Sequence, residues 1–366
     1  MDSDLILYIV VATALAFDFT NGFHDTANVV ATSISTRALP PRAAVAFAAI
    51  LNFVGAFISL EVAATVAKGI VDPDQIVGEQ GMIIVFAGLI GAITWNIATW
   101  WFGLPSSSSH ALIGGVVGAT FAAVGWGAID GNGILAKVAI PALIAPLLAF
   151  CVAGLAILVI YRIVGRQRPG PVTRGFKLGQ LASGGLLALA HGTNDAQKTM
   201  GIITLALVAN GNLASEGFEV PQWVVISAAT AIAAGTYMGG WRIIRTMGSR
   251  IIKMDAAQGF AAQSAGSVVI MSASHFGYPL STTHVINGGI MGAGAAKRLS
   301  AVRWGVAGNI MIAWVLTLPA AAAGGALCYG LTRIFGTGAL GPVVVSAFVV
   351  FALTVVFLKR AKGTTP

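Results

Sequence analysis

Two aspartates occur at matching places in two long apolar segments of this 366-residue chain. Residues 22–25 read Gly-Phe-His-Asp and residues 192–195 read Gly-Thr-Asn-Asp, an offset of 170 residues. A carboxylate at the centre of a bilayer helix costs about 2.5–3.5 kcal/mol on insertion scales, so Asp25 and Asp195 need a reason to be there. One interpretation is coordination of a cation such as Na⁺. The other is uptake of a proton, because burial favours the neutral carboxylic acid.

Amide side chains and one lysine accompany the two acids. Asn21 and Asn28 flank the first acid, and Asn194 precedes the second. Carboxylate and amide oxygens together make the hard-oxygen cage that suits Na⁺, so these residues are candidates for cation coupling. Lys198 lies three residues after Asp195 and fits two roles equally well: it balances a bound phosphate, or it forms an ion pair with Asp195 that only holds helices together.

A second duplicated motif consists of hydroxyl side chains that follow a proline. Residues 105–110 read Pro-Ser-Ser-Ser-Ser-His and residues 279–284 read Pro-Leu-Ser-Thr-Thr-His, an offset of 174 residues. Such a pattern is typical of a helix N-terminus, where free backbone N–H groups and the positive end of the helix dipole bind oxyanions. The residues predicted to contact an anion are Ser107, Ser108, Ser109, Ser281, Thr282 and Thr283.

Four histidines lie within or beside these motifs: His24, His110, His191 and His284. An imidazole can carry a proton near neutral pH or can donate to an anion. A purely structural role as a hydrogen-bond partner between helices is an equal alternative for each of them.

The composition predicts that helices in a membrane position these residues. Hydrophobic residues make up 57% of the chain and charged residues only 9%, whereas roughly a quarter of the residues in soluble domains are charged. The formal charge of +8 comes from Lys and Arg scattered over short loops, which indicates membrane topology rather than nucleic-acid binding. We therefore expect an all-α polytopic protein of the cytoplasmic membrane.

Eleven apolar segments are expected to span the bilayer, since about 20 helical residues cross its hydrocarbon core. The first and sixth are too long for one plain helix, and each carries its acidic motif in the middle, so both are predicted to be helices broken at the membrane midplane. The short pieces at 102–110 and 276–284 would fit re-entrant hairpins. The eleven segments cover approximately 5–35, 43–67, 81–101, 109–128, 134–161, 176–209, 222–241, 259–276, 283–296, 302–332 and 340–358.

The distribution of Lys and Arg among the loops predicts an outside N-terminus and an inside C-terminus. Five spans separate Asp25 from Asp195, so the two halves are predicted to be inverted-topology repeats, which support alternating access in secondary transporters. The chain has no Walker A motif, so energy must come from an ion gradient or from the gradient of the substrate. The predicted units are a first transmembrane repeat (1–161), a cytoplasmic basic linker (162–177), a second, inverted repeat (178–334), and a final transmembrane helix with a C-terminal tail (335–366).

Both acidic motifs resemble the signature sequences of a known family. Residues 19–28, Phe-Thr-Asn-Gly-Phe-His-Asp-Thr-Ala-Asn, and residues 191–201, His-Gly-Thr-Asn-Asp-Ala-Gln-Lys-Thr-Met-Gly, are similar to the two signatures of the PiT family of inorganic phosphate transporters. Residues 279–284 resemble the Ser-Thr-Thr-His element of that family. The resemblance covers almost the whole chain and implies cation-coupled symport of inorganic phosphate.

The resemblance also implies roles for single residues. It places Asp25, Asn28, Asn194 and Asp195 in the cation-coupling and phosphate core, with the hydroxyl residues contacting phosphate. The chain has His24 before Asp25 where many members have Asn, a pattern that looks like the bacterial low-affinity Pit type. For that type, proton coupling and transport of a metal-phosphate complex are the family expectation.

The resulting hypothesis is a secondary active transporter, not an enzyme, that imports inorganic phosphate by symport with H⁺ or Na⁺. Asp25 and Asp195 are the candidate Na⁺ ligands, and no cofactor or resident metal is expected. The expected partners are phosphate, the coupling cation and the lipid bilayer, without nucleic acid, and a homodimer is compatible with such a fold. A sulfate symporter of the same fold and an anion channel are the alternatives, whereas consecutive serines and duplicated symmetry favour binding over the chemistry of an intramembrane hydrolase.

Overall fold

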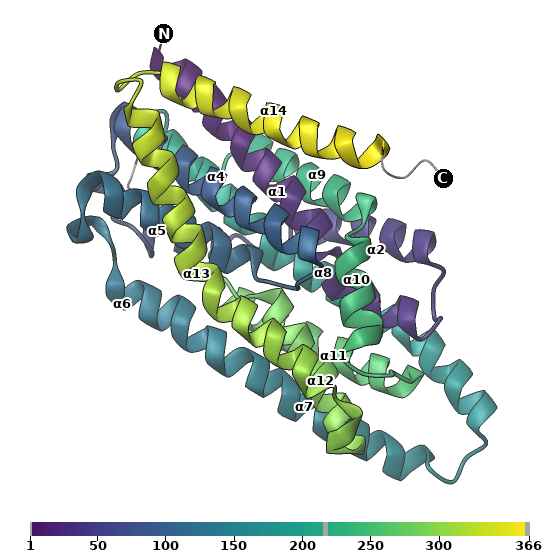
Figure 1. The fold of residues 1–366 in the computed structure, drawn as a ribbon. Helices are drawn as coiled ribbons and strands as arrows, with labels where there is room; N and C mark the ends of the chain where they lie inside the picture. Colours follow the sequence, from purple (N-terminus) through teal and green to yellow (C-terminus); the bar gives the residue numbers. More distant parts are fainter. Residues whose placement is uncertain (1, 215–218, 363–366) are drawn as a thin grey trace.

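The computed structural model describes residues 2–214 and 219–362, and most of these are helical (Figure 1). Residue 1, residues 215–218 and residues 363–366, which end the predicted C-terminal tail, lie outside the described part. An isolated bridge between Val71 and Ile129 is the extended pairing recorded there. The α-helices are α1 (Asp2–Ser35), α2 (Pro41–Gly55), α3 (Glu61–Lys68), α4 (Gly78–Phe102), α5 (Ser108–Val124), α6 (Gly131–Ile134), α7 (Ile140–Val164), α8 (Pro169–Ala209), α9 (Gln222–Met238), α10 (Trp241–Arg245), α11 (Ala256–His275), α12 (Thr282–Lys297), α13 (Trp304–Arg333) and α14 (Leu340–Lys362).

Several of these helices are long and apolar enough to cross a membrane by themselves. By length and composition there are four in the described part, and a fifth if the bent pair Gln222–Met238 and Trp241–Arg250 forms one span. The eleven predicted spans therefore outnumber the helices that meet this criterion in the described part. One cause is that α5 and α12 are short helices, and another is that the segment 43–67 is divided into α2 and α3. The four single helices are Ser3–Ser35, Gly78–Phe102, Gly131–Val164 and Trp304–Arg333.

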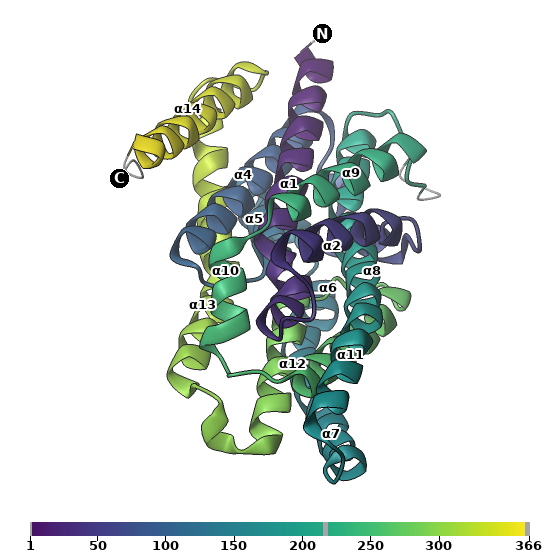
Figure 2. The same cartoon turned by 90° about the vertical axis from the view of Figure 1, so that its right-hand side faces the viewer.

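Helices α7 and α13 form outer edges of the bundle (Figures 1 and 2). They expose large aliphatic side chains, including Leu143 and Leu147 on α7 and Val315 and Leu327 on α13. Exposure of such an apolar surface to water is unfavourable, whereas contact with lipid tails is not. The polar side chains of the acidic motifs are instead buried between the helices. This distribution is that of a multi-pass membrane protein.

The prediction that the first and sixth segments break at their acidic motifs is wrong. Helix α1 runs unbroken from Asp2 to Ser35, and α8 runs unbroken from Pro169 to Ala209. Their polar side chains find partners on neighbouring helices and loops, so the backbone does not need to unwind to satisfy them. The chain breaks instead between α4 and α5 and between α11 and α12, near the pieces expected to form re-entrant hairpins.

The glycines of the acidic motifs serve helix packing. A Cβ atom at Gly22 on α1 would lie 2.3 Å from the carbonyl oxygen of Ile232 on α9. The equivalent Gly192 on α8 faces the carbonyl oxygen of Asn52 on α2 at 2.1 Å. Only glycine permits such a close approach of helix backbones. Each half therefore packs its motif helix against the second helix of the other half.

Helices α5 and α12 show the same reciprocal close packing against a helix of the other half. A Cβ atom at Gly118 on α5 would lie 2.0 Å from the carbonyl oxygen of Ala322 on α13, and one at Gly292 on α12 would lie 2.1 Å from that of Phe150 on α7. Reciprocal contacts of this kind arise when two related halves are exchanged by a two-fold axis. They agree with the duplication read from the sequence, while the opposite orientation of the halves in a membrane stays a prediction.

The junction between the halves is short. Helix α7 ends at Val164 and α8 begins at Pro169. Most of the predicted linker 162–177 therefore belongs to the ends of these two helices. Helix α14 follows the second half and packs against α13 and α1 (Figure 2).

Candidate functional site

Two broken helix pairs bring the hydroxyl motifs into the interior. We call α4, residues 103–107 and α5 the first hairpin, and α11, residues 276–281 and α12 the second hairpin. The first helix of each pair, α4 or α11, ends just before a glycine with a positive φ, Gly103 (φ +65°) or Gly277 (φ +74°). Both angles lie in the left-handed region that favours glycine. The side-chain oxygen of Ser107 accepts from the backbone N–H of His110 at 3.1 Å, and that of Ser281 accepts from His284 at 3.3 Å.

The predicted helix starts are therefore confirmed, and the structure identifies Ser107 and Ser281 as their N-caps. The two tips also meet each other. The Ser109 hydroxyl of the first hairpin donates to the carbonyl oxygen of Leu280 in the second at 3.0 Å. The rings of His110 and His284 pack edge to face with centroids 4.8 Å apart. These two histidines thus lie at the contact between the hairpins.

The acidic motifs meet at the same place. Asp25, His191 and Asp195 are all buried, and each offers one ligand atom within 4.8 Å of the others. Residues 170 positions apart in the sequence thus form one cluster with the donor types of a cation site. His191, which the sequence left between a proton role and a structural one, contributes its imidazole to this cluster, since its Nε2 lies 3.0 Å from Asp195 Oδ2.

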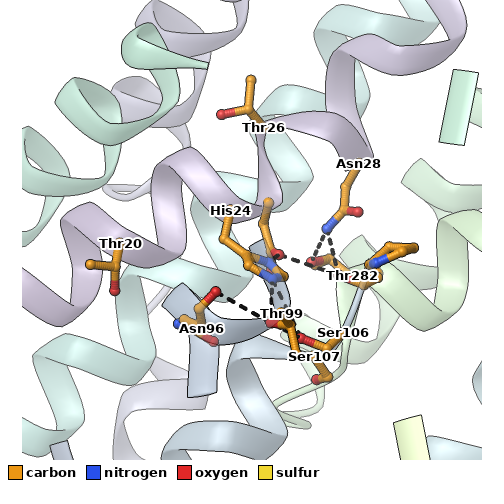
Figure 3. A network of polar contacts seen from close by, with 12 residues as sticks. Thr20, His24, Thr26, Asn28, Asn96, Thr99, Ser106, Ser107 and Thr282 are labelled. Carbon is orange, nitrogen blue, oxygen red and sulfur yellow. Dashed lines mark hydrogen bonds and ion pairs between the residues drawn. The ribbon is translucent and has the colours of Figure 1, made fainter. Parts of the chain in front are cut away.

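His24 connects the first acid to the first hairpin (Figure 3). Its Nδ1 lies 2.6 Å from Asp25 Oδ1, and its Nε2 lies 3.1 Å from the hydroxyl of Thr99 on α4. The hydroxyl of Ser106 in turn donates to Thr99 at 2.8 Å. Thr99 was not predicted as a site residue, because nothing in the apolar sequence of α4 shows that this threonine faces the acidic motif.

Asn28 connects α1 to the second helix start, as Figure 3 shows. Its amide nitrogen donates to the hydroxyls of Thr282 at 3.1 Å and Thr283 at 2.9 Å. Thr283 also donates to Asp25 Oδ1 at 3.3 Å. The amide oxygen of Asn28 is buried and has no hydrogen-bond partner within the described part of the chain. This oxygen remains available to a ligand.

The second acid is surrounded by donors. Asp195 Oδ2 accepts from the Thr282 hydroxyl at 3.1 Å, in addition to its contact with His191. Asp195 Oδ1 accepts from Lys198, which is itself buried. The ion pair that the sequence offered as one interpretation of Lys198 is therefore present. The amide nitrogen of Asn194 donates to the Ser274 hydroxyl at 2.8 Å and so ties α8 to the second hairpin, while its amide oxygen, like that of Asn28, is buried without a hydrogen-bond partner among the described residues.

One buried acid was missed by the sequence analysis. Asp18 on α1 is fully buried. The side chains of Asn21 and Thr199 lie beside it. Asp18 precedes Asp25 by seven residues, which is two helical turns, so both carboxylates lie on the same face of α1. That spacing within an apolar segment was a signal that could have found it.

A family model matches the part of the chain that carries this site. The model of the phosphate transporter family matches residues 21–174 and 166–325. The chain belongs to the phosphate transporter family. The matched regions include both acidic motifs and both hairpins.

Relatives of similar length carry the same description. A probable low-affinity inorganic phosphate transporter of Mycobacterium tuberculosis is 50% identical over 98% of this chain and 85% of the relative. One of Rhizobium meliloti is 51% identical over 90% of this chain and 98% of the relative. A solved structure titled as the sodium-dependent phosphate transporter has a TM-score of 0.81 at 24% identity and covers 90% of this chain and 99% of that one. These relatives are transporters, and this phosphate transporter family member is a transporter of the cell membrane rather than an enzyme.

Proposed function

We propose that this chain imports inorganic phosphate by symport with a cation. The observation that carries the proposal is the meeting of two helix starts, one from each half, beside the cluster of Asp25, His191 and Asp195. The names of the relatives support phosphate as the substrate. Free phosphate and a divalent metal-phosphate complex are both compatible with a cluster of carboxylate, imidazole and hydroxyl groups.

The hairpin tips supply the anion-binding part of the proposed site. The Ser108 hydroxyl on the first turn of α5 is buried and has no partner among the described residues, so it can donate to a phosphate oxygen. Ser109, Thr282 and Thr283 stand on the same first turns, next to the positive ends of two helix dipoles. Helix dipoles and hydroxyl donors at neighbouring helix starts favour an oxyanion.

The acids supply the cation-binding part. A cation or proton at Asp25, next to the free amide oxygen of Asn28, offsets the negative charge that phosphate brings. A site that holds only the anion or only the acids leaves uncompensated buried charge, which is costly in a membrane interior. Only the neutralised assembly can then rearrange, and this requirement couples phosphate transport to the cation.

The proposal is tested with purified protein in proteoliposomes and labelled phosphate. Accumulation under an imposed pH or Na⁺ gradient identifies the cation. We expect Asp195→Asn to abolish accumulation, because the amide cannot balance the Lys198 ammonium. Asp74→Asn is the matched control, since it makes the same substitution at an exposed carboxylate in the short turn that precedes α4.

Two results would overturn the proposal. Phosphate movement that never exceeds equilibrium under any gradient would indicate a channel. Uptake that a low concentration of unlabelled sulfate suppresses would move the assignment to a sulfate symporter.

A further inference from the structure

The Lys198 ammonium lies in a complete oxygen cage. Its Nζ donates to the Ser109 hydroxyl at 2.5 Å, to the Leu280 carbonyl oxygen at 2.9 Å and to Asp195 Oδ1. These oxygens come from α5, from the loop of the second hairpin and from α8. An ammonium group has three donors, so every one of its protons is used.

The same oxygens are those that a free monovalent cation would use. A carboxylate, a hydroxyl and a carbonyl from a non-helical loop are typical hard-oxygen ligands of ions in transporters. The second oxygen of Asp195 is already engaged by Thr282 and lies against His191. While Lys198 is in place, both oxygens of the Asp195 carboxylate are already engaged, and a second cation beside Asp195 would have to share them with the ammonium.

The first half shows what this position looks like without a lysine. Lys198 follows Asp195 by three residues, and Asn28 follows Asp25 by three. Asn28 donates to Thr283 on the helix start of the second half, whereas Lys198 donates to Ser109 on the helix start of the first half. The two contacts are thus reciprocal. They differ in charge, because the Asn28 amide is neutral. Its buried oxygen has no hydrogen-bond partner among the described residues.

We propose that Lys198 is a resident cation: its ammonium takes, in the second half, the place that a free coupling cation would occupy beside Asp195. The inference rests on the proposed function and deepens it, since it assigns the choice of coupling cation at this position to one residue. Each transport cycle then needs one free cation fewer than it would with a neutral residue at 198.

The test compares substitutions of Lys198 that leave the space between its three oxygen partners empty with one that fills this space by an uncharged side chain. Lys198→Ala removes the charge and leaves space for a sodium ion against the three oxygens. Lys198→Met removes the charge but retains most of the side-chain volume. Lys177→Met is the matched control, because it makes the same substitution on α8 outside the site. Uptake of labelled phosphate is measured against sodium concentration, with choline as the replacement ion and a constant pH gradient.

We expect Lys198→Ala to gain a sodium requirement of about one ion relative to the wild type. Its ratio of uptake in sodium to uptake in choline should exceed the wild-type ratio by about tenfold or more. Lys198→Met should be slow in both media, and Lys177→Met should match the wild type. If Lys198→Ala responds to sodium no more than the wild type, or if Lys198→Met gains the same response, the inference is wrong.

A second measurement is independent of transport. Thermal unfolding of the detergent-purified proteins without phosphate should show a sodium-dependent rise of the midpoint in Lys198→Ala beyond any rise in the wild type. This readout stands even if the wild type takes up no phosphate, which would contradict the proposed function alone. Lys198→Ser serves as a second vacating variant. If neither vacating variant folds when purified in sodium, sodium cannot replace the ammonium and the inference fails.

Discussion

Replacement of Gly292 by alanine tests whether close packing of α12 positions the site. A Cβ atom there would lie 2.1 Å from the carbonyl oxygen of Phe150 and 2.7 Å from its Cα atom, where ordinary contacts begin at 3.4 Å. Both obstacles are backbone atoms of α7, so neither can rotate away. The two helices must separate by about 1.3 Å, and overpacking of this kind costs about 1–3 kcal/mol of stability.

The displacement also reaches the site. Helix α12 begins at Thr282, whose hydroxyl donates to Asp195 at 3.1 Å, and a shift of about 1 Å takes this pair beyond hydrogen-bond range. Misplacement of binding groups by about 1 Å can lower a rate about 100-fold. We therefore expect Gly292→Ala to lower both the unfolding midpoint and the initial rate of phosphate uptake.

Gly154→Ala provides the control in the same interface. A Cβ atom at Gly154 on α7 would lie 3.5 Å from the Gly292 carbonyl oxygen, an ordinary contact. Alanine there should leave uptake unchanged and should stabilise the helix by up to about 1 kcal/mol. Equal midpoints and equal uptake rates for the two variants would refute the claim that backbone contact at Gly292 positions the helix start.

Two further predictions concern residues that the sequence analysis did not identify. Thr99→Val keeps the side-chain shape but removes the hydroxyl that contacts His24 and Ser106. Loss of a hydrogen-bond partner for these buried groups costs about 1–3 kcal/mol, so the initial rate of phosphate uptake should fall about tenfold or more. An unchanged rate would show that transport does not depend on the contact between His24 and Thr99. Asp18→Asn removes the charge of a buried carboxylate that lies beside Asn21 and Thr199. We expect the unfolding midpoint to hold or rise while uptake falls, whereas a large loss of stability would show that Asp18 is a structural residue.

The local chemistry of the helix starts could be read from the sequence. Proline followed by hydroxyl residues predicted the N-termini of α5 and α12, and the caps are present at Ser107 and Ser281. Capping depends on neighbours within three residues, so it leaves a short-range signal. Duplication extended that signal, because two copies of a buried acid at a constant offset predicted that both belong to one interface.

The continuity of α1 and α8 through their acidic motifs could not be predicted from the sequence. A polar motif in an apolar segment predicts either an unwound helix or a helix whose side chains find remote partners. Here Asn28 and Lys198 find theirs on the opposite hairpins, more than 80 positions away in sequence. The partner carbonyl oxygen of Leu280 carries no sequence signal at all, since every residue has one. Contacts with residues remote in sequence, rather than the local sequence, therefore allow α1 and α8 to stay helical.

The two halves pack reciprocally, but only the second has a lysine three residues after its acid. This difference in charge affects how a cation could be coupled to phosphate transport. Lys198 cannot leave its helix, so it compensates Asp195 in every state of the transport cycle in which the cage of Ser109 and Leu280 stays closed. Asp25 has the His24 imidazole and the Thr283 hydroxyl as its hydrogen-bond partners, and no lysine is among the partners found in the described residues. Under the proposed symport mechanism, we expect the charge at Asp25 rather than that at Asp195 to limit the return of the empty carrier. We therefore expect the cation that enters and leaves with phosphate to act at Asp25.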